Sequence, residues 1–159
     1  MGTEINNDDV ARLRMTLGRI SRLLDRQSLG SGLTRTQLSV LGTVARKGPM
    51  RIGDLAEAEG LNPTMLSRVL AILSDSGLVR RLADRDDARV SLIEITAAGS
   101  REHQRIREQR SRLLRAGLDA LEADHAEHLI AALPLLEELF EHMRDGAASS
   151  APRRAKARA

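Results

Sequence analysis

The sequence predicts a mainly α-helical protein with one small β-hairpin. Alanine, leucine and arginine dominate the 159 residues, a mixture that favours helices. Apolar residues recur at steps of three and four over most of the chain, which is the spacing of one helix face. Two short runs, 79–83 and 90–95, are instead rich in β-forming residues and predict the hairpin. A chain of this length buries one core, so one domain with flanking helices is expected.

Residues 1–32 are expected to form one long dimerisation helix, from about residue 8 to residue 29. Its apolar residues share one face. They are Val10, Leu13, Leu17, Ile20 and Leu24. Asp8 or Asp9 is expected to cap the helix, and the glycines after residue 29 end it. Leu13, Leu17 and Ile20 are assigned to a dimer interface, although packing against the rest of the domain would explain this stripe equally well.

Residues 33–99 are predicted to begin with two short helices. Thr34 and Gln37 match a capping box at the start of the first helix, and Gly48 followed by Pro49 ends it. The second helix is expected over residues 50–60, after which a tight turn leads to a third helix. Two helices joined by a glycine-containing turn of this length are a helix-turn-helix signature, with a generic helical hairpin as the alternative.

Asn62 is expected to cap the third helix, with Pro63 at its first position and Gly77 at its end. Its predicted buried face comprises Met65, Leu66, Val69, Leu70, Ile72 and Leu73. The opposite face carries Thr64, Ser67, Arg68 and Ala71. Such short side chains let a helix approach the major groove of DNA, where Arg68 can reach a guanine edge or a phosphate. An ordinary solvated face is the alternative, although such a face usually carries more Glu and Lys.

The predicted hairpin carries a charged loop, from Asp84 to Arg89. Arginine at the tip of a projecting hairpin can enter a narrow minor groove, where negative potential is concentrated. The neighbouring aspartates fit this interpretation if they pair with Arg85 or Arg89 and hold the guanidinium in place. Taken alone, the loop could equally be a charged turn in solvent. A helix-turn-helix followed by such a hairpin predicts a winged helix-turn-helix domain over residues 33–99.

Several short motifs occur in the order found in one known family. They are Leu33-Thr34-x-x-Gln37, Leu66-Ser67-Arg68, Gly77-Leu78-Val79-x-Arg81, Asp87-x-Arg89 and Ile95-Thr96-x-x-Gly99. Over residues 8–144 the chain resembles the MarR family of bacterial winged helix-turn-helix transcription regulators. The Asp-x-Arg motif together with Gly-Leu-Val-x-Arg at this distance is specific, whereas either motif alone is weak.

The resemblance implies a homodimer that binds double-stranded DNA at a pseudo-palindromic operator, usually as a repressor. The expected DNA-binding residues are Asn62, Pro63, Thr64, Ser67 and Arg68 in the third helix and Arg85, Asp87 and Arg89 in the wing. The resemblance itself implies Thr64, Ser67, Arg68, Asp87 and Arg89. Asp87 would orient Arg89 in the minor groove. Family members typically release DNA when a small anionic or phenolic compound binds, so a small-molecule effector of unknown identity is expected. The chain departs from members that sense oxidation, because it has no Cys, and it also lacks Tyr and Trp for a stacked aromatic pocket.

Residues 100–145 are expected to form C-terminal dimerisation helices. Thr96 is predicted to cap a helix that runs to about residue 118–120, and a short break near 121–124 follows. A last helix then carries an apolar seam at steps of four and three. The seam comprises Leu129, Leu133, Leu136, Phe140 and Met143, of which the first four are assigned to the dimer interface. Pro134 should kink this helix or mark a local break.

Residues 146–159 lack apolar periodicity and are expected to be a disordered basic tail. The tail holds Arg153, Arg154, Lys156 and Arg158. Without these four, 21 Lys and Arg residues stand against 22 Asp and Glu residues, so the body of the protein is close to neutral. DNA binding would therefore depend on a few placed arginines and not on bulk charge.

Other functions are disfavoured by what the sequence lacks. It has no glycine-rich phosphate loop and no Ser/His/Asp set, so an enzyme is not expected. Neither a cofactor nor a metal is expected, although His125 and His128 share a helix face near acidic residues. The polar N-terminus and the lack of an apolar run of membrane-spanning length favour a cytoplasmic protein without a membrane partner. A winged-helix protein-interaction module and an effector-independent DNA-binding protein remain as alternatives.

Overall fold

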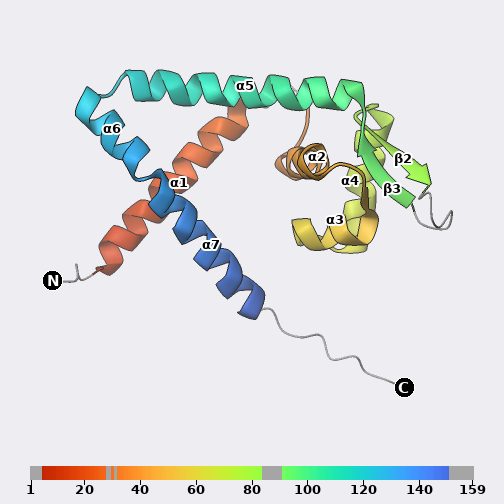
Figure 1. Ribbon diagram of the computed structural model, residues 1–159, viewed down its shortest axis with the longest axis horizontal. Coiled ribbons are helices and arrows are strands. Elements are labelled where there is room, and N and C mark those ends of the chain that lie inside the picture. Colours follow the sequence, from red (N-terminus) through yellow and green to blue (C-terminus); the bar gives the residue numbers. More distant parts are fainter. Residues whose placement is uncertain (1–4, 28–29, 31, 84–90, 151–159) are drawn as a thin grey trace. The chain divides into compact units, whose positions relative to one another are not determined.

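The computed structural model describes residues 5–27, 30, 32–83 and 91–150 of the chain, with the backbone alone for 147–150 (Figure 1). The chain divides into two compact units, Met1–Leu113 and Leu114–Ala159. Helix α5 (Ala97–Asp119) runs from the first unit into the second.

The first unit combines helices with a small antiparallel sheet. Its other helices are α1 (Asn7–Gln27), α2 (Arg35–Lys47), α3 (Ile52–Glu59) and α4 (Pro63–Asp75). Its strands are β1 (Met50–Arg51), β2 (Val79–Ala83) and β3 (Ser91–Ile95), which lie in the order β1-β3-β2. Figure 1 shows β2 and β3 as a hairpin that leads directly into α5. The predicted fold class, mainly α with a small hairpin wing, is confirmed.

Three helices, α2, α4 and α5, begin at the predicted capping residues. At the start of α2, the Gln37 amide donates to Thr34 Oγ1 (3.3 Å) and the Thr34 amide donates to Gln37 Oε1 (2.7 Å). Helix α1 differs, because Asn6 Oδ1 accepts the Asp9 amide (2.8 Å) and Asn6 is therefore the cap. Asp8 and Asp9 lie instead in the first turn, where negative charge suits the positive end of the helix dipole.

The first two residues of the predicted helix 50–60 form a strand instead. Met50 and Arg51 pair with Ile93 and Leu92 of β3. Without β1, the central strand β3 would leave backbone donors and acceptors unpaired along this edge. A strand of two residues is too short to leave a periodic signal in a sequence, which is why the prediction missed it.

The core of the first unit lies between α2, α3, α4 and the sheet. Its most deeply buried side chains are Val40, Leu41, Val44, Leu55, Leu66, Leu73 and Ile93. Helix α4 contributes Leu66, Val69, Leu70 and Leu73, as predicted. The prediction was wrong for Met65 and Ile72, which are 46% and 47% exposed. Both lie on the flank of α4, about 90° or more from the centre of its buried face, and so miss the core.

The second unit comprises the end of α5, α6 (Ala123–Ala131) and α7 (Leu133–Ser150). Helix α6 ends just before Pro134, which is the second residue of α7, so the predicted local break is confirmed. Helix α7 also includes residues 146–150, which the sequence assigns to the tail. Alanine has the highest helix propensity, and Ala147 and Ala148 continue the helix past Gly146. Residues 151–159 lie outside the described residues.

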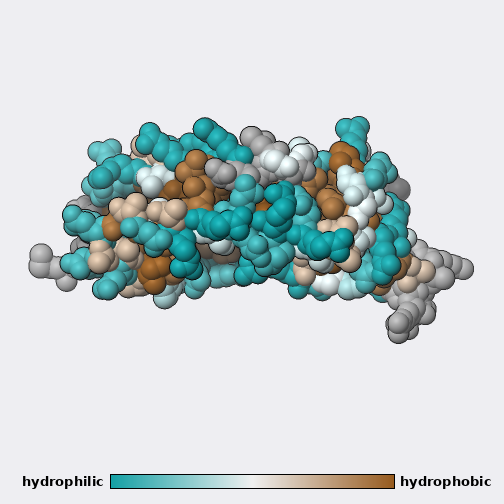
Figure 2. All heavy atoms as spheres, turned by 90° about the horizontal axis from the view of Figure 1, so that it is seen from above, coloured by the Kyte–Doolittle hydropathy of each residue, from teal (hydrophilic) through white to brown (hydrophobic). Residues whose placement is uncertain are grey.

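The apolar stripes assigned to dimerisation are exposed in the single chain. Leu13, Leu17 and Ile20 of α1 are 45%, 46% and 43% exposed. Leu129, Leu133, Leu136 and Phe140 are 50%, 46%, 38% and 61% exposed. Figure 2 shows hydrophobic residues reaching the surface in several places between hydrophilic ones. Within the described ranges, every helix falls short of the length and apolar character needed to cross a membrane.

Candidate nucleic-acid interface

Helix α4 begins at a side-chain cap followed by a proline. Asn62 Oδ1 accepts the Met65 amide (2.8 Å), and Pro63 occupies the first helical position, where its missing N–H costs no hydrogen bond. Both residues are exposed. The first turn of α4 is therefore capped and open to an approaching molecule.

One face of α4 is free of the core and carries mostly small side chains. Thr64, Ser67, Arg68 and Ala71 are all exposed on this face, as the helical spacing predicts. Throughout the described part of the chain, no residue forms a hydrogen bond or an ion pair with the Arg68 guanidinium. We call these four residues the α4 face. It offers an uncommitted cation between side chains that leave room for close approach.

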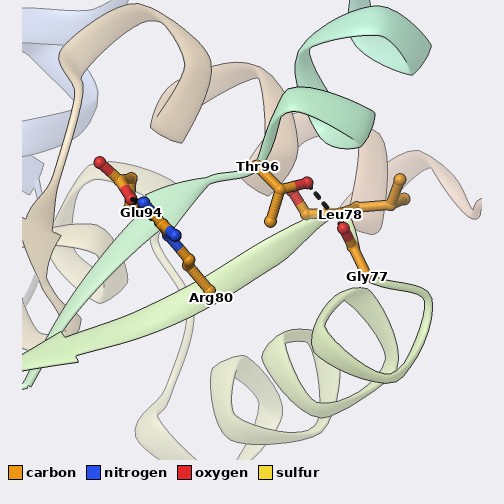
Figure 3. A network of polar contacts seen from close by, with 5 residues as sticks. All are labelled: Gly77, Leu78, Arg80, Glu94 and Thr96. Carbon is orange, nitrogen blue, oxygen red and sulfur yellow. Dashed lines mark hydrogen bonds and ion pairs between the residues drawn. The ribbon is translucent and has the colours of Figure 1, made fainter.

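The hairpin of β2 and β3 has one side on the core and one side outward. Val79, Ile93 and Ile95 lie on the core side, as the two-residue period of a strand requires. On the outward side, Arg80 Nε donates to Glu94 Oε2 at 2.6 Å (Figure 3). The two residues are directly opposite across the strands, where an opposite-charge pair stabilises the ladder.

Arg81 lies on the core side of the hairpin, but its side chain is not part of the core. It is opposite Ile93 in the register, yet its side chain is exposed. Because α4 packs against β2, Arg81 belongs to the side of the sheet that bears α4. Arg81 is therefore a second exposed cation, on the side of the sheet against which α4 packs.

The residues assigned to the wing tip, Arg85, Asp87 and Arg89, lie outside the described residues. The strands that carry this loop are described, and Ala83 pairs with Ser91 at its base. The pairing of Asp87 with Arg89 stays a prediction.

Thr96 joins the hairpin to α5. Its hydroxyl donates to the Gly77 carbonyl at 2.6 Å (Figure 3). The same oxygen accepts the Gly99 amide (3.0 Å), so Thr96 caps α5 as predicted. The Thr96 amide donates to the Leu78 carbonyl (3.0 Å). Gly99 packs on the same carbonyl, since a Cβ at this position would lie 2.0 Å from Leu78 O. The end of α4, the start of β2 and the first turn of α5 therefore meet at this junction.

His103 of α5 lies against Gly42 of α2. A Cβ on Gly42 would lie 3.4 Å from His103 Nε2, so the glycine allows the ring to approach the helix closely. Burial lowers the pKa of His103, and the positive charges of Arg46, Arg107 and Arg110 lower it further. The folded protein therefore favours a neutral imidazole at this helix contact.

We expect the free energy of unfolding to decrease as the pH is lowered, because the pKa of His103 is lower in the folded protein than in the unfolded chain. In the unfolded chain the imidazole takes up a proton near pH 6.5, whereas the folded chain binds this proton only at lower pH. Below about pH 6.5 the unfolded state therefore binds more protons, and the free energy of unfolding decreases until the pH passes below the folded pKa. Urea unfolding at about pH 7, 6 and 5 should show a smaller decrease for His103→Gln than for the wild type.

A matched control for that measurement is His125→Gln, at an exposed histidine of α6. This variant should retain the pH dependence of the wild type. If His103→Gln also retained it, the assigned role of the half-buried imidazole would be wrong.

Asp25 links α1 to two other elements of the first unit. Its carboxylate pairs with Arg35 at the start of α2 and with Arg110 of α5 (3.2 Å). The Asp25 side chain is 25% exposed, so water screens these pairs only in part. No sequence pattern signals the contact with Arg110, because the two residues are 85 positions apart.

A surface pocket of about 520 Å³ lies beside the Thr96 junction. It is lined by Gly30, Leu33, Ser76, Leu78, Ala98, Glu102 and Arg105. Its two charged side chains neutralise each other, since Arg105 donates to Glu102 (2.6 Å) and thereby lowers the pKa of that carboxyl. Among the described residues, no group of three or more His, Asp or Glu side chains is placed to hold a metal ion.

Sequence reasoning missed three parts of this interface: the Arg80–Glu94 pair, the exposure of Arg81 and the bond from Thr96 to Gly77. Opposite charges in neighbouring strands signal a possible pair, but only when the register is known. The long loop between the strands leaves the register open, because turn type fixes it only in short hairpins. The bond from Thr96 to Gly77 spans 19 positions and has no local signature.

Comparisons with known proteins agree with this architecture. A sequence profile of the MarR family matches residues 33–91. The uncharacterized HTH-type transcriptional regulator ML2140 of Mycobacterium leprae (strain TN) is 32% identical over 129 residues, which are 81% of this chain and 90% of that protein. The crystal structure of RV1404 from Mycobacterium tuberculosis has a TM-score of 0.77 at 20% identity, covering 87% of this chain and 97% of the other.

A second solved structure adds a bound nucleic acid. A mutant of MepR from Staphylococcus aureus, bound to an oligodeoxyribonucleotide, has a TM-score of 0.65 at 21% identity. The match covers 86% of this chain and 99% of that one. At such identities the solved structures show a shared fold, which is the predicted winged helix with flanking helices.

Proposed function

Because the chain belongs to the MarR family of transcriptional regulators, we propose that it represses transcription as a homodimer bound to a pseudo-palindromic DNA operator. Membership of a regulator family confirms the prediction that the chain is not an enzyme. The oligodeoxyribonucleotide bound to the MepR mutant supports DNA as the partner. Such a protein would act in the cytoplasm, on the bacterial chromosome.

The observation that carries the proposal is the α4 face around Arg68. Recognition helices of helix-turn-helix proteins lie in the major groove with their N-terminal residues toward the base edges. Here that end presents Asn62, Pro63 and Thr64, followed by Ser67 and Arg68. The uncommitted guanidinium of Arg68 has the geometry for two hydrogen bonds to guanine O6 and N7.

We further propose that the wing enters the minor groove, with Arg89 as the inserted cation, Asp87 as its orienting partner and Arg85 nearby. The register supports this, because the Ala83–Ser91 pair, to which the wing residues are joined in sequence, lies at the opposite end of the hairpin from Thr96. Arg81 would lie between the two groove contacts. Since the body of the protein is nearly neutral, these few arginines would supply most of the attraction to phosphate.

A second copy of the chain is the proposed partner of the exposed apolar stripes. Leu13, Leu17 and Ile20 of the first unit and Leu129, Leu133, Leu136 and Phe140 of the second would be removed from water. On an operator with half-sites one helical turn apart, the two α4 helices of the dimer would need to lie about 34–36 Å apart.

Release from DNA by a small molecule is the remaining part of the proposal. The pocket of about 520 Å³ beside Thr96 is bounded by both α5 and the end of α4, so a molecule bound there would contact both elements. The effector's chemistry is left open. No cofactor is proposed.

The direct test is a mobility-shift and footprinting assay on the DNA upstream of the protein's own gene. We expect protection of two half-sites one helical turn apart and a dimer by light scattering. A protein that bound no duplex, even one selected from a random pool, would favour the protein-interaction alternative. A monomer would contradict the proposed assembly.

Arg68→Ala is expected to weaken operator binding by about 1–3 kcal/mol, if the guanidinium is bidentate to a base. The loss should be larger on the operator than on random duplex of the same length, because base contacts carry the sequence preference. Titration by fluorescence anisotropy at fixed salt measures both values. Arg12→Ala, at an exposed residue of α1, is the matched control and should bind as the wild type does. Equal losses on both duplexes would make Arg68 a phosphate contact.

A further inference from the structure

We propose that the Thr96 hydroxyl is a positioning group that fixes the angle between α5 and α4, and thereby the half-site spacing that the dimer accepts. This inference rests on the proposed function, since spacing has meaning only for a dimer on DNA. It concerns the bond from Thr96 to Gly77 and not the capping of α5.

The Thr96 side chain is bonded on two sides of the junction. Its hydroxyl donates to the Gly77 carbonyl at 2.6 Å, with the Leu78 carbonyl also within reach at 3.3 Å. The same oxygen accepts the Gly99 amide at 3.0 Å. Figure 3 shows the Thr96 side chain directed across the junction toward Gly77 and Leu78. One hydroxyl therefore connects the first turn of α5 to the segment that follows α4.

That segment controls the end of α4. Helix α4 ends at Asp75, and only Ser76, Gly77 and Leu78 separate it from β2. Gly77 has φ +67°, a left-handed conformation that turns the chain sharply. Holding the Gly77 carbonyl therefore holds the point where α4 turns into the sheet.

Helix α5 extends from the Thr96 junction into the second unit. It starts next to Thr96 and continues as one helix to Asp119, into the unit that bears the stripe from Leu129 to Phe140. In the proposed dimer, a change of angle at the junction would move α4 with respect to the subunit interface. A long helix turns a small rotation at one end into a large displacement at the other. The distance between the two α4 helices would then change.

Capping and bridging make different demands on the side chain. The cap needs only an acceptor for the Gly99 amide, whereas the Gly77 carbonyl needs a donor. Threonine and serine supply both, aspartate supplies the acceptor alone, and valine supplies neither. Thr96→Ser, Thr96→Asp and Thr96→Val therefore separate the two roles.

The test uses the full-length dimer and an operator selected by the wild type from a random duplex pool. Its affinity is compared with that for duplexes carrying one base pair more or fewer between the half-sites, and with that for a single half-site. One inserted base pair shifts the half-sites by about 3.4 Å and rotates them by about 35°. We expect the wild type and Thr96→Ser to share the same preference for native spacing. In Thr96→Asp and Thr96→Val the preference should fall by about tenfold, since each dimer loses two such bonds.

The single half-site distinguishes positioning from general damage. Its affinity should be nearly unchanged in all three variants, and it also reports any repulsion of DNA by the new aspartate. A preference retained in Thr96→Asp but lost in Thr96→Val would show that capping alone matters, and would overturn the inference. So would an equal loss on the half-site and on every spacing. If Thr96→Val fails to fold, the comparison of Ser with Asp still decides the question. If the wild type binds no duplex, the proposed function fails and this inference fails with it.

Discussion

A methyl group at position 99 should force α5 away from β2. In Gly99→Ala the new Cβ would lie 2.0 Å from the Leu78 carbonyl oxygen and 2.8 Å from Ile95 Cγ1. The nearer obstacle is backbone, which cannot rotate aside as a flexible side chain can. Relief of the clash would stretch the bond from the Thr96 amide to the same carbonyl. Overpacking typically costs about 1–3 kcal/mol, so with the weakened hydrogen bonds we expect about 3 kcal/mol or more.

Urea unfolding should therefore show a much lower midpoint for Gly99→Ala than for the wild type. Gly117→Ala is the matched control, because it lies in the same helix and a Cβ there would meet nothing within 4 Å. That control should be stabilised by up to about 1 kcal/mol, since alanine favours helices over glycine. Equal midpoints for Gly99→Ala and the wild type would disprove the close packing at the junction.

Leu17→Asp should abolish the dimer and with it tight operator binding. Leu17 is 46% exposed in the single chain, and the proposed interface covers it with a second copy. Each dimer of the variant would bury two carboxylates in an apolar contact, which is strongly unfavourable. A dimer bound to two half-sites also gains from linkage, so separate monomers should bind the operator about 100-fold more weakly or worse.

Met15→Asp provides the control on the same helix. Met15 is 48% exposed, but it lies about 160° around α1 from Leu17, off the stripe. We expect light scattering to give a monomer for Leu17→Asp and a dimer for Met15→Asp, with binding lost only in the first. A dimer in both variants would exclude the α1 stripe from the interface, and monomers in both would mean that the interface surrounds the helix.

The parts of the fold that sequence predicted correctly have local causes. Thr34 with Gln37, Asn62 with Pro63, and Thr96 each act on a helix that starts within three residues of them. The break at Pro134 is local for the same reason, since the ring removes a donor and clashes within one turn. A neighbouring residue can still cap the helix instead. In α1 the cap is Asn6, whereas the sequence predicts Asp8 or Asp9.

The parts that sequence did not predict depend on distant partners. Strand β1 forms by pairing with the edge of β3, and the residue types of Met50 and Arg51 do not predict a strand. Met65 and Ile72 are apolar and lie next to the buried face of α4 in the helical repeat. The width of that face depends on the elements that pack against α4, namely α2, α3 and β2. In the candidate interface, the exposure of Thr64, Ser67 and Arg68 followed from periodicity alone. The small side chains of this face predicted contact with DNA, and the family resemblance supplied the individual roles of these residues.

The pairing of β1 with β3 also sets an order of events during synthesis. Helices α2, α3 and α4 are close in the chain, and α2 and α4 carry their own side-chain caps, so their contacts can form as soon as they leave the ribosome. Strand β1 emerges before α3, but its partner Ile93 follows only after α4 and β2 have been made. Until then the core lacks Ile93 and Met50 has no strand to join. The sheet should therefore be the last part of the first unit to close, and a nascent chain that stalls before Ser91 should expose the apolar residues of α2 and α3 that β3 covers.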